Sequence, residues 1–122
     1  MALSDIRTVE YVLTQWGKWA YIGRGLSLYY PSVEPHERMR QVNRSSTGLT
    51  DGEAEAVDAV VSVMRCRHRR AHDAIALHYV AGYPYRKVGE ELGVHQRTAR
   101  DWVEQGRMYV EAALVFGAPN TR

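Results

Sequence analysis

The sequence lacks the features that mark secreted and membrane-bound proteins. Its 122 residues include a single cysteine, Cys66, so the chain cannot close an internal disulfide, as expected of a protein in a reducing compartment. No apolar run approaches the roughly 20 residues that a membrane-spanning helix needs, and residues 1–5 do not resemble a signal peptide. We therefore expect a soluble, cytoplasmic protein of a bacterial host that has no membrane partner.

The residue patterns of common catalytic and cofactor sites are missing as well. The glycines at 23–25 lack the preceding strand and the Lys-Ser/Thr ending of a phosphate-binding loop. The carboxylates at 51–58 fall in the first turns of an expected helix, where acidic residues ordinarily complement the helix dipole. Four cysteine and histidine residues lie close together in the sequence, but their spacing does not match that of known zinc sites. They are Cys66, His68, His72 and His78. We therefore expect no enzyme, no metal site and no cofactor.

The chain also has little net charge, but the charge is separated along the sequence. The formal net charge is only +2, yet acidic residues gather at 51–58 and basic residues at 65–70. A local basic cluster indicates contact with nucleic-acid phosphates. DNA and RNA both remain open as its partner. The cluster consists of Arg65, Arg67, His68, Arg69 and Arg70.

Helical periodicity accounts for most of the sequence. Apolar residues at helical spacing predict helices over 5–20, 51–68 and 71–81, with 21–49 irregular between the first two. With 45% hydrophobic residues, the chain is large enough for one core. The sequence therefore predicts a compact all-α single domain over 1–122.

Local signals refine two of these segments. Ser4 is a good N-cap for the first helix, and Thr50 with Glu53 forms a capping box for the second. The irregular segment holds tyrosines that either pack over the core or contact a partner, and packing is favoured because a tyrosine ring buries readily. These tyrosines are Tyr21, Tyr29 and Tyr30.

Residues 84–116 carry the most informative pattern, that of a helix-turn-helix. Val88 and Leu92 share one helical face, and Gly93 follows, where a glycine ends a helix by adopting a positive φ. A long last helix then runs from His95 to about Phe116. In a DNA-binding helix-turn-helix, the start of this second helix meets base edges in the major groove.

The exposed face of the last helix is polar and rich in hydrogen-bond donors at its start. Gln96, Arg97 and Arg100 are the base-reading candidates, since Gln and Arg make bidentate contacts to adenine and guanine. His95 is a weak N-cap type, which favours a phosphate or base contact instead. The alternative is an ordinary helical hairpin with a solvated charged face. The full set of DNA-binding candidates is Arg86, Lys87, His95, Gln96, Arg97, Thr98, Arg100 and Asp101.

The stretches DIRTVEYVLTQWGKWA at 5–20 and HDAIALHYVAGYPYRKVGEELGV at 72–94, with the long last helix, resemble the phage antitermination protein Q family of the phage 21 type. The second half also resembles region 4 of sigma factors. The family resemblance implies a late-gene regulator that binds double-stranded DNA beside a promoter. It further implies engagement of a paused bacterial RNA polymerase with its sigma factor, readthrough of terminators, and nascent RNA as a further partner.

The first helix offers candidates for the polymerase contact. Trp16 continues its apolar stripe and is expected in the core, whereas Tyr11, Gln15 and Lys18 are expected on the exposed flank. Two other functions remain open. One is a promoter-binding activator or repressor without antitermination activity, and the other is a component of a DNA-processing enzyme such as a recombinase or terminase.

Overall fold

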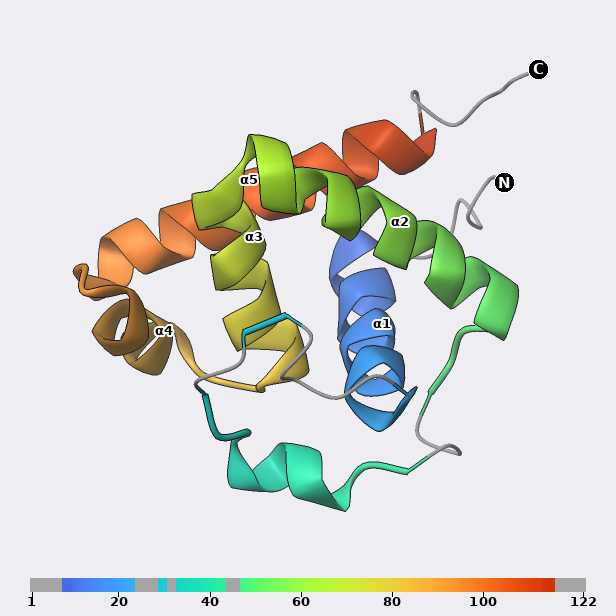
Figure 1. Cartoon of the computed structure of the whole chain (residues 1–122), viewed down its shortest axis with the longest axis horizontal. Coiled ribbons are helices and arrows are strands. Elements are labelled where there is room, and N and C mark those ends of the chain that lie inside the picture. Colours follow the sequence, from blue (N-terminus) through green and yellow to red (C-terminus); the bar gives the residue numbers. More distant parts are fainter. Residues whose placement is uncertain (1–7, 24–28, 31–32, 44–46, 116–122) are drawn as a thin grey trace.

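The computed structural model in Figure 1 describes residues 8–23, 29–30, 33–43 and 47–115. No described residue lies in a strand, which confirms the predicted all-α class. No helix in this part of the chain is long and apolar enough to cross a membrane. The elements in chain order are α1 (Val9–Gly23), η2 (Glu37–Gln41), α2 (Asp51–Arg67), α3 (Arg69–Ile75), η4 (Ala76–Val80), α4 (Tyr85–Leu92) and α5 (Gln96–Val115).

Helix α5 is the longest element, and it contacts α1, α2, α3 and α4. Figure 1 shows it passing behind α3, with α4 at one end, while α2 runs from the right of the view to the top of α3. The apolar stripes of these helices meet in one core, which excludes water from the largest side chains. The largest fully buried side chains include Leu13, Trp16, Met64, Ile75 and Leu77.

The first helix begins later and ends later than the sequence predicts. Thr8 is not helical, and its hydroxyl oxygen accepts a hydrogen bond from the Tyr11 N–H at 3.1 Å, as an N-cap residue does. The helix therefore starts at Val9 and runs past Ala20 to Gly23. The predicted start at Asp5 and the predicted cap at Ser4 lie outside the described residues.

Helix α2 begins with the predicted capping box, in which Thr50 and Glu53 exchange hydrogen bonds between side chain and backbone. It ends at Arg67, and His68 forms the break before α3. The expected start at Ala71 is therefore wrong, because α3 already begins at Arg69.

The end of α3 widens into a π-helical turn, η4, that periodicity does not reveal. Within it the N–H of Ala81 donates to the carbonyl of Ala76 at 3.0 Å, one residue further back than in an α-helix. Gly82 follows with φ 81°. The turn packs against α1.

Helices α4 and α5 are joined by a short turn at 93–95. Gly93 has φ 71°, the left-handed conformation expected from the sequence. Gly89 lies so close to the turn that a β-carbon there would come within 2.7 Å of the Val94 carbonyl oxygen. Helix α5 starts at Gln96 and is described to Val115, so its predicted end at Phe116 lies outside the described residues.

The segment predicted to be irregular is more structured than expected. It contains η2, whose Met39 is buried, and the His36 N–H donates to the Ala81 carbonyl at 2.7 Å. Tyr29 is buried in the core, while Tyr21 and Tyr30 are half-buried against it. Packing of these tyrosines over the core is thereby confirmed.

Candidate nucleic-acid interface

The start of α5 presents polar side chains to solvent, while the opposite face of the helix is buried in the core. Ala99 and Val103 are fully buried, which fixes the rotation of the helix about its axis. Within the described part of the chain, no carboxylate pairs with Arg97 or Arg100. Thr98 is half-buried, and the exposed members of the predicted set on this helix are Gln96, Arg97, Arg100 and Asp101.

His95 has a different role from the one its residue type suggests. Its Nδ1 accepts a hydrogen bond from the Arg97 N–H at 3.0 Å, so the side chain caps α5 directly. His95 therefore acts as the N-cap of α5, although its residue type is a weak N-cap. Its Nδ1 is engaged by the helix end and is not open to a phosphate.

Arg86 and Lys87 extend the exposed surface onto α4. Arg86 makes an ion pair with Glu90 at 2.7 Å, and the Lys87 ammonium lies 5.6 Å from the centroid of the Tyr83 ring. Both side chains are exposed. Exposed pairs of this kind stabilise by only about 0.3–0.5 kcal/mol, so a phosphate can replace the carboxylate beside Arg86.

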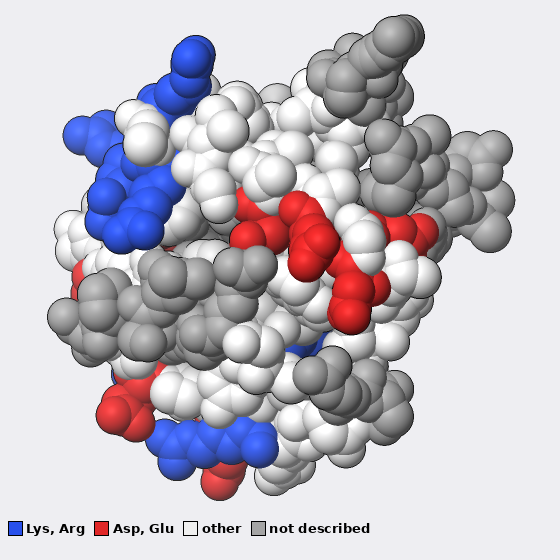
Figure 2. Space-filling model, turned by 45° about the vertical axis from the view of Figure 1, so that its right-hand side comes forward, with Lys and Arg blue, Asp and Glu red and all other residues white. Residues whose placement is uncertain are grey.

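The arginine cluster, which consists of Arg65, Arg67, His68, Arg69 and Arg70, surrounds the corner between α2 and α3. Every member is exposed. Arg69 pairs with Asp73 at 3.1 Å, and the Arg70 guanidinium carbon lies 5.5 Å from the centroid of a Trp102 ring. Figure 2 shows Lys and Arg side chains gathered in one group at the upper left, apart from the Asp and Glu side chains nearer the centre.

The cluster borders a cavity of about 510 Å³ against the flank of α5. The rings of His68 and Tyr109 meet there edge to face, with centroids 5.0 Å apart. We call this cavity the basic groove. Sequence reasoning missed its α5 side because those residues lie far along the chain from the cluster. The groove is lined by Arg67, His68, Arg69, Arg70, Ala71, Gln105 and Tyr109.

The basic groove and the start of α5 occupy different sides of the helix. Arg100 and Tyr109 are nine residues apart in the sequence, which places them half a turn apart around an α-helix and about 14 Å apart along its axis. The structure therefore separates the predicted candidates into two cationic surfaces.

The predicted polymerase-binding residues on α1 are only partly exposed in the structure. Gln15 is only 8% exposed, and its Oε1 accepts a hydrogen bond from the Gly48 N–H at 2.8 Å. Tyr11 is 40% exposed, with its hydroxyl beside Gly48, and Lys18 is half-buried. The expectation that Gln15 is exposed is wrong because residues 47–49 cover this flank.

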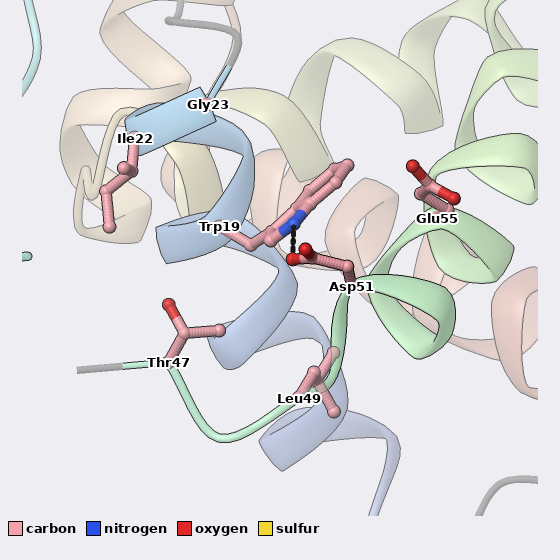
Figure 3. A pocket seen from close by; sticks show the side chains of 7 residues that line it. All are labelled: Trp19, Ile22, Gly23, Thr47, Leu49, Asp51 and Glu55. Carbon is pink, nitrogen blue, oxygen red and sulfur yellow. Dashed lines mark hydrogen bonds between the residues drawn. The ribbon is translucent and has the colours of Figure 1, made fainter. Parts of the chain in front are cut away.

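A second cavity, of about 450 Å³, lies between the end of α1 and the start of α2. Figure 3 shows Trp19 inside it, donating from its indole N–H to Asp51 at 3.1 Å. Asp51 and Glu55 make this cavity acidic, so it does not attract phosphates. No group of His, Cys, Asp or Glu that could hold a metal ion occurs among the described residues.

Asp58 has a structural role in the core. It is expected from the sequence to complement the dipole of the helix that starts at Asp51, but it lies inside the protein. Its carboxylate is buried and accepts hydrogen bonds from the Trp16 indole at 3.2 Å and the Tyr29 hydroxyl at 2.7 Å. Burial of a carboxylate is tolerated where such donors surround it. Asp58 therefore ties α1 and Tyr29 to α2, and Trp16 lies in the core as predicted.

A second polar network links α1, η4 and α5. The Tyr79 hydroxyl donates to Glu10 at 2.6 Å, and Arg107 lies 3.6 Å from Glu10 and 2.8 Å from Glu104. Burial and the bond to Glu10 raise the pKa of Tyr79 well above its usual range. The phenol therefore stays protonated and keeps donating to Glu10, which holds α1 against η4.

Comparison with known proteins gives one match that covers nearly the whole chain. The family model described as phage antitermination protein Q matches residues 6–119. Curated proteins and solved structures gave no significant match. This match confirms the resemblance to the antitermination protein Q family that the sequence suggested. A role in transcription antitermination follows from it. The chain belongs to the phage antitermination protein Q family.

Proposed function

We propose that this chain is a sequence-specific DNA-binding antitermination factor that reads its site with the start of α5. One observation carries the proposal. Gln96, Arg97 and Arg100 stand exposed at the first turns of a helix whose opposite face is fixed in the core. A rigid helix with Gln and Arg at its N-terminal end fits the geometry of major-groove recognition.

The neighbouring residues have supporting roles in this proposal. Arg86 and Lys87, exposed on α4, bind backbone phosphates and set the register of α5 on the duplex. Asp101 accepts a hydrogen bond from a cytosine amino group, and Thr98 adds a polar contact. His95 acts through the geometry of α5, because its Nδ1 caps the helix.

Membership of the antitermination family supports a proposal for the regulatory step. We propose that the DNA-bound protein engages RNA polymerase and its sigma factor where the enzyme pauses near a promoter. The modified polymerase then reads through terminators and expresses late phage genes. In this role the chain is a regulatory factor and not an enzyme.

In vitro transcription across a terminator tests the proposal. The template carries the binding site, obtained by selection from random duplexes, between a promoter and an intrinsic terminator. We expect readthrough by host polymerase only with both the protein and this site. The control template has the site scrambled, and the control protein carries Arg97→Ala and Arg100→Ala.

The competing function is a promoter-binding activator or repressor. If the chain has this function, the number of transcripts initiated should change, but the fraction of transcripts that continue past the terminator should stay the same. That result would contradict antitermination by this chain while leaving DNA recognition intact.

A further inference from the structure

The basic groove combines two kinds of groups that a duplex-binding surface does not need together. Arg67, Arg69 and Arg70 supply positive charge at its rim, and the rings of His68 and Tyr109 lie inside it. In a duplex the bases are stacked inside and only the phosphates are accessible to such a surface. Aromatic rings between cations instead match single strands, whose exposed bases stack while their phosphates bind Arg.

We propose that the basic groove is a binding site for single-stranded RNA. An unpaired base enters beside His68 and Tyr109, and the flanking phosphates bind Arg67 and Arg70. Gln105, at the α5 edge, offers an amide that can donate to or accept from a base edge. The proposal is independent of base reading by α5, which lies on another side of that helix.

The charges and dimensions of the groove support this assignment. Within the described residues no carboxylate pairs with Arg65, Arg67 or Arg70, and the one pair, Arg69 with Asp73, is largely solvent-exposed on its arginine side. The volume of about 510 Å³ lies within the range of about 300–1,000 Å³ typical of small-molecule sites. One nucleotide with its phosphates therefore has both room and charge complementarity.

The site also differs from the other cavities of the chain. The cavity at the start of α2 is acidic, with Asp51 and Glu55 in its wall. A third cavity, of about 550 Å³ beside η2 and α1, mixes Glu10 with Lys18 and Arg38. The third cavity also places Arg38 beside a pair of rings, His78 and Tyr79, but Glu10 lies in its wall, whereas no described carboxylate lines the basic groove.

Fluorescence anisotropy with short labelled RNAs of uridine or adenosine tests the proposal on the full chain. Tyr109→Ala should weaken RNA binding about tenfold, since stacking on one aromatic ring contributes about 1–3 kcal/mol. Tyr109→Phe retains the ring and should bind within about twofold of the parent. Circular dichroism melting of each variant controls for folding.

The arginine contact has a matched control elsewhere on the chain. Arg67→Gln should lower RNA affinity and reduce the slope of log affinity against log salt by about 0.7, as expected for one lost single-strand phosphate. Arg40→Gln makes the same charge change at an exposed arginine of η2 that pairs with Glu34, and should leave the slope unchanged. Equal slopes for both variants would overturn the proposal.

Two further measurements keep the result decisive if Tyr109→Ala does not fold. RNA containing 4-thiouridine, crosslinked to the unaltered protein, should attach at His68 or Tyr109. Attachment confined to residues 96–101 would contradict the groove assignment. Duplex DNA should bind Arg67→Gln as it binds the parent, and an equal loss of duplex and RNA affinity in this variant would show a duplex phosphate contact instead.

Discussion

Gly17 of α1 lies directly against the backbone carbonyl of Tyr79 in η4, with no room for a β-carbon between them. The π turn at Ala76–Val80 places that carbonyl toward α1. Two helices can approach this closely only where one of them lacks a side chain. The glycine of the WGKWA stretch is therefore a packing residue.

Gly17→Ala should lower the free energy of unfolding by about 1–3 kcal/mol, because the added methyl group meets backbone that cannot rotate away. Urea denaturation measures the change. Gly52→Ala is the matched control, since it is also helical but has nothing within 4 Å of the added carbon. An equal loss in both variants would show that the close approach is unimportant.

Asp58→Ala should destabilise the fold by about 1–3 kcal/mol for each buried donor left without an acceptor. The donors are the Trp16 indole and the Tyr29 hydroxyl. Asp58→Asn keeps one carbonyl oxygen and should recover part of the loss. Thermal melting compares the two variants. Similar melting temperatures for Asp58→Asn and Asp58→Ala would show that these hydrogen bonds do not stabilise the fold.

We expect His78 to make the stability of the fold depend on pH. The free energy of unfolding should fall as the pH drops below about 6.5, the usual pKa of histidine. Burial lowers the pKa of His78, although its bond to the Tyr83 carbonyl acts in the opposite direction. The unfolded chain therefore binds a proton at a higher pH than the folded chain, and the free energy of unfolding decreases until folded His78 is itself protonated. His78→Gln should show a shallower decrease in urea titrations over the same pH range.

His95→Ala should lower stability by about 0.5–2 kcal/mol through loss of the α5 cap. His95→Asn restores a capping side chain and should recover both stability and duplex binding. If His95→Asn is as stable as the parent yet binds duplex DNA much more weakly, then the ring contacts DNA in addition to capping.

Arg97→Ala and Arg100→Ala should each weaken binding to the selected duplex by about 1–3 kcal/mol and relax preference at one base position. Selection from random duplexes with each variant measures the preference. Arg86→Ala should instead weaken binding to all sequences alike, as a phosphate contact does. Unchanged preferences in both α5 variants would refute base reading by these arginines.

The parts of the fold that follow from neighbouring residues could be predicted from the sequence. The Thr50 and Glu53 capping box and the positive φ of Gly93 depend on a few adjacent residues and appear where expected. Trp16 lies in the core because the helical period alone places it there.

The parts that depend on distant segments could not be predicted. Gln15 is polar and sits beside the apolar stripe, yet residues 47–49 bury it. Nothing in the local pattern shows the π turn at η4 or the approach of Tyr109 to His68. The two groups of candidate cations could thus be predicted from the sequence, but the groove that joins the arginine cluster to Tyr109 could not.

Helix α2 carries carboxylates in its first turn and guanidinium groups in its last. The two ends of α2 therefore differ in side-chain charge although the formal net charge of the chain is only +2. We expect a nearby polyanion to attract the basic α2–α3 corner and to repel the acidic start of α2 before any contact forms. The protein should therefore meet nucleic acid with this corner foremost. The rate of association should then fall with ionic strength more steeply than the net charge alone would predict.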